Sequence, residues 1–144
     1  IYKSNALTVV NDTTATSPVG TIQALKRFGG PETVLIIGGT DRDLDFTELG
    51  EIIPQFIQPS NLVFLAGSAT EKIRLALGTF AVNCPVYDSL EECVEVAFKK
   101  SGQYPQSVIL FSPASKSFEK FKNEYDRGKQ FNSLIKKHLE PNSG

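Results

Sequence analysis

Four short polar segments each follow an apolar run, and the residue types of three of them could bind an anionic substrate. The first, NDTTATSP at residues 11–18, offers the carboxylate of Asp12 and several hydroxyls. Asp12 could hydrogen-bond a hydroxyl group or a metal-bound water, and Thr16 and Ser17 precede a predicted helix start, where anions are favoured. A loop that only caps a helix would need no more than Ser17 and Pro18, and that alternative stays open.

The second polar segment is GGTDRD at residues 38–43, where two glycines permit a sharp turn and close backbone approach. Its arginine, Arg42, can hold a carboxylate or a phosphate in a forked, charge-assisted pair. The alternative is a solvated surface arginine paired with one of its aspartate neighbours, which are Asp41, Asp43 and Asp45.

The third segment is SPASKS at residues 112–117, after the last apolar run. Ser117 and Phe118 are predicted to begin a helix, whose unpaired N–H groups and Ser117 hydroxyl could receive a carboxylate. The alternative is an ordinary amphipathic helix with solvated lysines. The fourth segment, AGSATE at residues 66–71, has the composition of a turn and a helix cap, and no role is assigned to it.

Several catalytic motifs are absent from the sequence. It contains no Walker-type phosphate loop, no G-x-G-x-x-G fingerprint and no G-x-S-x-G elbow. With a single histidine, His138, a Ser-His-Asp triad is not expected. Cys84 and Cys93 fit no metal or redox spacing, so the sequence predicts no metal site, and two such thiols favour a reducing, cytoplasmic compartment.

Length and composition describe one ordinary domain. The chain has 144 residues and a net charge of −1, which favours neither nucleic acid nor an anionic membrane as a partner. No apolar run reaches the roughly 18 residues of a membrane span. The sequence has no methionine and begins at Ile1, so we expect a piece of a longer protein.

Apolar runs alternate with amphipathic segments along the whole chain. Strands are predicted at 6–10, 33–39, 61–68, 84–88 and 107–113. Helices are predicted between Ser17 and Gly29, at 46–57 with Pro54 as a candidate interruption, at 69–80, at 90–100, from about Ser117, and at 127–139. Ser89 and Glu92 form a capping box for the fourth of these. The alternation predicts one α/β domain over 1–144, an open, mostly parallel sheet with helices on both faces and a ligand crevice at the carboxyl ends of its strands.

Three stretches, in this order and at these distances, resemble a Mur ligase. They are VVNDTTATSPVGTIQAL, LIIGGTDRDLDFTELG and LFSPASKSFEKFKNEYDRGKQFNSL, and the likeness covers about residues 7–139. The chain is similar to the C-terminal domain of that family, a three-layer Rossmann-like domain, and within the family it looks most like the members that add D-glutamate.

The resemblance implies an enzyme of three domains, of which the UDP-binding and the central ATPase domains would be missing from this chain. The implied reaction uses ATP and Mg²⁺ to phosphorylate the carboxylate of UDP-N-acetylmuramoyl-L-alanine, and the amine of D-glutamate attacks the resulting acyl phosphate. This domain would close over ATP and position the amino acid, and it would be inactive alone.

The resemblance also assigns roles to single positions. Asp12 matches the family acid that faces the nucleotide, and Thr16 matches an amino-acid contact. Arg42 stands where the family usually has a lysine that binds a carboxylate. Ser117 and Phe118 match the pair that holds the other end of the amino acid.

Two positions depart from the family pattern. The family commonly has lysine where this chain has Thr14, and phenylalanine where it has Glu124. Two alternatives therefore remain open. One is a related ligase that adds another amino acid, and the other is a stand-alone α/β binding module without catalysis.

Overall fold

The computed structural model describes residues 2–117 and 119–139. Its elements follow the predicted alternation of strands and helices. The strands are β1 (Tyr2–Lys3), β2 (Leu7–Asn11), β3 (Thr33–Ile37), β4 (Leu62–Leu65), β5 (Val86–Tyr87) and β6 (Ser107–Phe111). The α-helices are α1 (Pro18–Phe28), α2 (Thr47–Phe56), α3 (Ser68–Leu77), α4 (Leu90–Ser101) and α5 (Glu124–Leu139).

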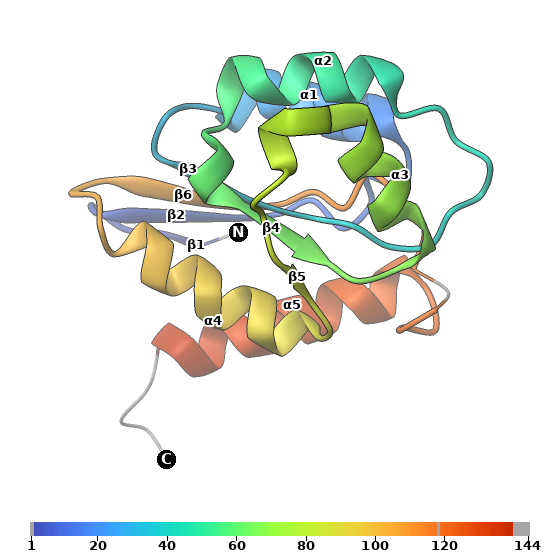
Figure 1. The fold of residues 1–144 in the computed structure, drawn as a ribbon. Coiled ribbons are helices and arrows are strands. Elements are labelled where there is room, and N and C mark those ends of the chain that lie inside the picture. The colour runs from blue at the N-terminus through green and yellow to red at the C-terminus, as the bar shows by residue number, and fades with distance from the viewer. Residues whose placement is uncertain (1, 118, 140–144) are drawn as a thin grey trace.

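The strands form one sheet in the order β1-β2-β6-β3-β4-β5. All pairings are parallel except that of β1 with β2. Figure 1 shows α1, α2 and α3 on one face of the sheet and α4 and α5 on the other. The predicted fold class, an open and mostly parallel α/β sheet with helices on both faces, is therefore confirmed.

Alternate residues of the central strands fill two apolar layers. Leu35 and Ile37 pack beneath α1, α2 and α3, whereas Val34 and Ile36 pack against α4 and α5. All five residues of β3 are buried, as expected for a parallel strand covered on both faces. Both cysteines are buried free thiols, and burial raises the pKa of Cys93 to about 12. None of the described helices has the length and apolar character needed to cross a bilayer.

The predicted helix caps and interruptions are confirmed only in part. The Ser89 half of the capping box is confirmed, because the Glu92 amide donates to Ser89 Oγ at 3.1 Å, and the Glu92 carboxylate accepts from that hydroxyl at 3.2 Å. Ser17 and Gly29 flank α1 as predicted, although the Ser17 side chain makes no capping hydrogen bond. Pro54 lies inside α2 without ending it. The short antiparallel strand β1 was not predicted.

The predicted helix from about Ser117 is wrong for the described residues. Residues 119–123 form turns and bends, and α5 begins only at Glu124. The Glu119 amide donates to Thr40 Oγ1 at 3.0 Å, which ties this segment to the loop after β3. Asn123 then accepts from the Asp126 amide at 2.9 Å through Oδ1, the pattern of a helix N-cap.

Candidate functional site

The loops that follow β3 and β6 lie at the carboxyl edge of the sheet, on the right-hand side of Figure 1. Because β6 lies between β2 and β3, the residues after these three strands are neighbours there. The Asp12 amide continues the sheet by donating to the Phe111 carbonyl at 2.8 Å. An isolated antiparallel bridge then joins Thr40 to Lys116. The chain order thus brings three of the predicted polar segments to one edge, where ligands of such sheets bind.

Asp12 is partly buried and held against the end of β6. The Ser112 hydroxyl donates to Asp12 Oδ2 at 2.7 Å. Burial raises the pKa of Asp12, and the hydrogen bond from Ser112 opposes that shift. The carboxylate is therefore oriented by the fold before any ligand arrives.

Arg127 of α5 is fully buried beneath the loops after β2 and β6. Its guanidinium donates four hydrogen bonds, all to neutral oxygens: Nε to Thr13 Oγ1 at 2.9 Å, Nη2 to the Thr13 carbonyl at 2.7 Å, and Nη1 to the carbonyls of Ser115 and Lys116 at 3.0 and 3.2 Å. Desolvation lowers the pKa of Arg127 to about 10, so it stays protonated at neutral pH. The result is a fixed positive charge beside the crevice, which favours an anion there.

Asn11 and Thr13, at the end of β2, extend the hydrogen-bonded network around Arg127, which we call the buried junction. Asn11 Nδ2 donates to the Gly128 carbonyl at 3.0 Å, and its Oδ1 accepts from the Thr13 amide at 3.2 Å. The Thr13 hydroxyl donates to the Glu124 carbonyl at 2.9 Å. The start of α5 is therefore fixed to the end of β2 by polar contacts rather than by apolar packing alone.

Thr16 and Lys116 meet at the carboxyl edge of the sheet. Lys116 Nζ donates to Thr16 Oγ1 at 3.3 Å, although the two residues are 100 positions apart in the chain. Both side chains are partly buried. The structure thus brings Thr16 next to the β6 loop, and it adds a cationic group that the sequence analysis did not single out.

Ser117 is buried, and its Oγ has no hydrogen-bond partner among the residues that the structure describes. It lines a cavity of about 10 Å³ together with Gly39, Thr40 and Arg127. A cavity of that size holds about one water molecule, or one oxygen of a ligand. Phe118, the predicted partner of Ser117, lies outside the described residues. Because no described helix starts at Ser117, its predicted contribution from a helix dipole is wrong, and its hydroxyl is the group that remains available.

The two glycines after β3 let the loops approach this closely. Gly38 has φ 128°, a region that side chains rarely adopt. A Cβ at Gly39 would lie 2.5 Å from the Lys116 carbonyl oxygen and 2.7 Å from Ser115 Oγ. The predicted sharp turn with close backbone approach is therefore present.

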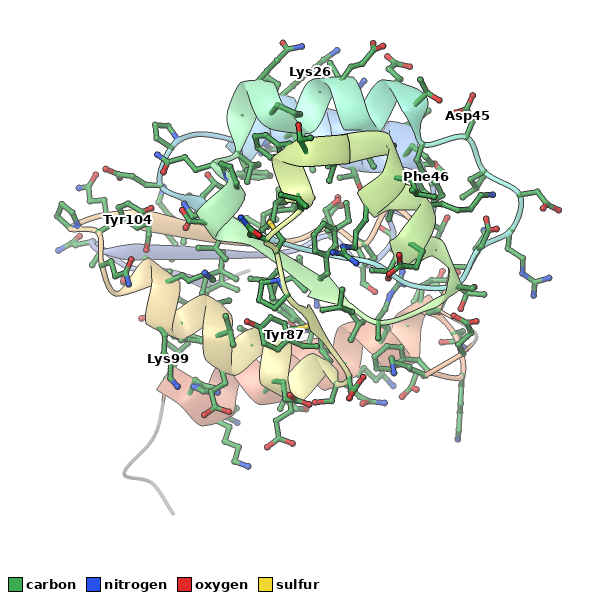
Figure 2. The ribbon with its side chains drawn as sticks, viewed as in Figure 1. Lys26, Asp45, Phe46, Tyr87, Lys99 and Tyr104 are labelled. Carbon is green, nitrogen blue, oxygen red and sulfur yellow. The ribbon has the colours of Figure 1, made fainter. Side chains whose placement is uncertain are left out.

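Arg42 lies on the exposed part of the loop between β3 and α2. Its neighbour Asp41 pairs with Lys72 at 3.0 Å, and the hydrogen bond from Lys72 lowers the pKa of Asp41. Figure 2 places Asp45 on the outside of this loop, next to the buried Phe46 at the start of α2. Arg42 thus lies on the same edge of the sheet as Asp12 and Ser117, but on its exposed rim.

Sequence reasoning counted Lys116 and Arg127 only among the cations of a locally positive C-terminal region and assigned neither an individual role. A signal for Arg127 exists, because it lies one helical turn before Phe131 and two before Ile135, which places it on the buried face of α5. Lys116 carries no such local signal, since its contact with Thr16 depends on strand order.

The described residues contain no group of three His, Cys, Asp or Glu side chains that could hold a metal ion. Larger hollows occur elsewhere, including one of about 580 Å³ between the start of α4 and α5, lined by Asp88, Lys120 and Lys129 among others. We place the candidate site at the strand ends instead, because the buried unpartnered hydroxyl and the fixed positive charge are there.

The chain matches several UDP-N-acetylmuramoylalanine--D-glutamate ligases. It is 42% identical over 131 residues to that of Borreliella afzelii, with 87% of this chain and 27% of the relative covered. It is 35% identical over 137 residues to that of Treponema pallidum, covering 94% and 24%, and 33% identical over 131 residues to that of Aquifex aeolicus, covering 91% and 30%. The chain belongs to the Mur ligase family.

As a Mur ligase chain, it spans only about a quarter of the length of these relatives, as the 27% and 24% coverages state. No family model matches the chain. The resemblance expected from the three polar segments is confirmed, and within the family the matches carry D-glutamate ligase names.

Proposed function

We propose that this chain is the C-terminal, amino-acid-binding domain of an ATP-dependent ligase that joins D-glutamate to UDP-N-acetylmuramoyl-L-alanine. The observation that carries the proposal is the 42% identity to a UDP-N-acetylmuramoylalanine--D-glutamate ligase over 131 residues. The crevice supports it, because a protonated Arg127 and an unpartnered Ser117 hydroxyl suit an anionic substrate.

Each residue of the site has a part in this proposal. The Ser117 hydroxyl donates to one carboxylate of the amino acid, and Thr16 donates to it from the β2 side. Arg42, on the exposed rim, binds a second carboxylate through a bidentate, charge-assisted pair of hydrogen bonds. Phe118 is proposed to hold the same end of the amino acid as Ser117. Together these groups hold the amine toward the activated carboxyl group, and such positioning lowers the barrier of a two-substrate reaction.

ATP and Mg²⁺ belong to the proposed reaction as well. The described residues fit a single polar contact to that side, Asp12, rather than a metal site of their own. We propose that Asp12 faces the nucleotide, and that ATP, Mg²⁺ and the UDP-sugar are held mainly by the UDP-binding and ATPase domains of the full-length enzyme. Bound Mg²⁺ would stabilise charge on the transferred phosphoryl group. The isolated chain is therefore expected to be inactive.

The test is ADP formation by the full-length protein, with UDP-N-acetylmuramoyl-L-alanine and a panel of amino acids. We expect D-glutamate to support a rate well above those of L-glutamate and D-aspartate. Equal rates with all three would refute the D-glutamate assignment and favour a ligase for another amino acid. Absence of any amino-acid-dependent ADP formation would favour a binding module instead.

A further inference from the structure

Lys116 is the feature of the crevice that the proposed function does not use. Both backbone polar groups of Lys116, its amide and its carbonyl, form hydrogen bonds. The Lys116 amide donates to the Thr40 carbonyl at 3.2 Å, and its carbonyl accepts from the Thr40 amide at 2.7 Å. The same carbonyl accepts from Arg127 Nη1 at 3.2 Å. The base of the side chain is therefore held in one place by the fold.

The ammonium group is directed to the β2 loop. Lys116 Nζ lies 3.3 Å from Thr16 Oγ1, and the Thr16 loop is itself ordered by a hydrogen bond from the Ala15 amide to the Asp12 carbonyl at 2.9 Å. A threonine hydroxyl that accepts from Lys116 keeps its own proton for another acceptor. The pair thus presents an O–H and an ammonium to the same acceptor.

The charge of Lys116 has no carboxylate partner in the part of the chain that the structure describes. The ion pairs found there join Lys72 to Asp41 and Arg74 to Glu71. An ammonium has three N–H donors, of which Thr16 accepts one. The ammonium therefore keeps donors that a ligand at the carboxyl edge of the sheet can use. The next residue is Ser117, whose buried hydroxyl has no hydrogen-bond partner among the described residues and lines the small cavity beside Thr40 and Arg127.

We propose that Lys116 binds a carboxylate of the amino-acid substrate, with Thr16 as its second donor. This inference rests on the proposed function, since it names a further contact in the same site. It adds a binding group from the loop after β6, whereas Arg42 lies on the exposed rim after β3. A phosphate of the nucleotide is the other anion that could reach the crevice, and the kinetics distinguish the two.

The test compares Lys116→Met with Lys116→Arg in the full-length protein. Methionine keeps the apolar stem and removes the charge, whereas arginine keeps the charge. We expect Lys116→Met to raise the KM for D-glutamate roughly tenfold or more, as the loss of a charge-assisted hydrogen bond would, with the KM for ATP changed less than about twofold. Lys116→Arg should recover most of the loss.

The matched control is Lys122→Met, which removes the same charge from an exposed position of the same loop. It should leave both KM values unchanged. Thermal unfolding of each variant separates a binding effect from a folding defect. D-Glutamine and D-isoglutamine, which each lack one carboxylate, then identify the group that Lys116 contacts. The preference for D-glutamate over one of these amides should shrink in Lys116→Met.

Two results would overturn the inference. One is an unchanged KM for D-glutamate in Lys116→Met, with both amide preferences intact. The other is a KM for ATP that rises as much as the KM for D-glutamate, which would assign Lys116 to the nucleotide. Failure of the wild-type protein to use D-glutamate would instead refute the proposed function, so the two failures are distinguishable.

Discussion

Two parts of the carboxyl edge are held in different ways. The buried junction, which consists of Asn11, Thr13, Ser115, Lys116 and Arg127, is fixed by hydrogen bonds within the chain. The rim loop, residues 41–45 between β3 and α2, is mostly exposed and has Asp41 paired with Lys72 at its start. Both parts carry an arginine, but Arg127 is 0% exposed whereas Arg42 is an exposed residue.

The difference separates two uses of the same residue type. Arg127 donates hydrogen bonds to three carbonyls of the chain and to the Thr13 hydroxyl, so it acts as a structural cation that also contributes to the local electrostatic field. Arg42 is on the surface, where its planar fork suits an external carboxylate. Substitutions of Thr13 or Arg127, whose side chains form the junction, should therefore change the free energy of unfolding. Substitutions in the rim loop should change substrate binding.

The largest expected effect is that of Arg127→Met. The variant removes the donors to three buried acceptors, which are the Thr13 carbonyl, the Thr13 hydroxyl and the Ser115 carbonyl. The Lys116 carbonyl keeps its hydrogen bond from the Thr40 amide. Each unsatisfied buried acceptor costs on the order of 1 kcal/mol or more, so the free energy of unfolding should fall by about 3 kcal/mol. Urea denaturation measures this fall. Arg127→Lys should not restore the wild-type value, because one ammonium cannot reproduce the fork. A loss under about 1 kcal/mol would contradict the structural role assigned to Arg127.

Arg42→Ala tests the rim loop. In the full-length protein it should raise the KM for the amino acid more than that for ATP, at a cost of about 1.5–3 kcal/mol for a lost charge-assisted contact. The free energy of unfolding should change by no more than about 0.5 kcal/mol, because the residue is exposed. Steady-state kinetics and urea denaturation of one preparation give both numbers. Equal effects on the two KM values would contradict the proposed role.

Thr13→Val should weaken the junction by a smaller amount. Valine has the shape of threonine but cannot accept from Arg127 Nε or donate to the Glu124 carbonyl. We expect a loss of about 1–2 kcal/mol in the free energy of unfolding. Thr13→Ser keeps the hydroxyl and is the control for the lost contacts. If valine is as stable as serine at this position, the hydroxyl contributes nothing to the junction.

Asp12→Asn tests how the free energy of unfolding depends on pH at this edge of the sheet. Burial raises the pKa of Asp12 above its unfolded value. Its protonated form therefore stabilises the fold below the unfolded pKa, and that contribution is lost as pH rises through the folded pKa. Asparagine imitates the protonated form, so the variant should be more stable than the wild type at neutral pH, with the difference vanishing near pH 4, about the ordinary aspartate value. Unfolding measured at both pH values checks this, and a variant less stable at neutral pH contradicts it.

Much of the fold could be predicted from local patterns. The five residues of β3 form an uninterrupted apolar run because both faces of that strand are covered. The start of α4 follows from the side-chain contact of Ser89 with the Glu92 amide, which lie three residues apart. Signals of this kind need only neighbouring residues to be read.

The candidate site could be predicted only in part. Strand ends indicated where Asp12, Thr16 and Ser117 would gather, because parallel strands share a carboxyl edge. The helix expected at Ser117 is reduced to a single turn, in which the Phe121 amide donates to the Ser117 carbonyl at 3.1 Å, and α5 begins only at Glu124. Thr13, which accepts from Arg127, lies 114 positions away from it in the chain. Thr16, which accepts from Lys116, lies 100 positions away from it. No local pattern encodes such contacts.

The place of β6 in the sheet has a consequence for the newly made chain. β6 is the last strand in the sequence, yet it lies between β2 and β3, and Val9 pairs with Ile109. Until residue 107 has left the ribosome, β2 and β3 have no common neighbour and present open edges. Contacts of such long sequence separation are slow to form. Chains truncated before β6 should therefore lack a continuous sheet and be prone to aggregate. Chains that include this strand should fold only after it has been synthesised.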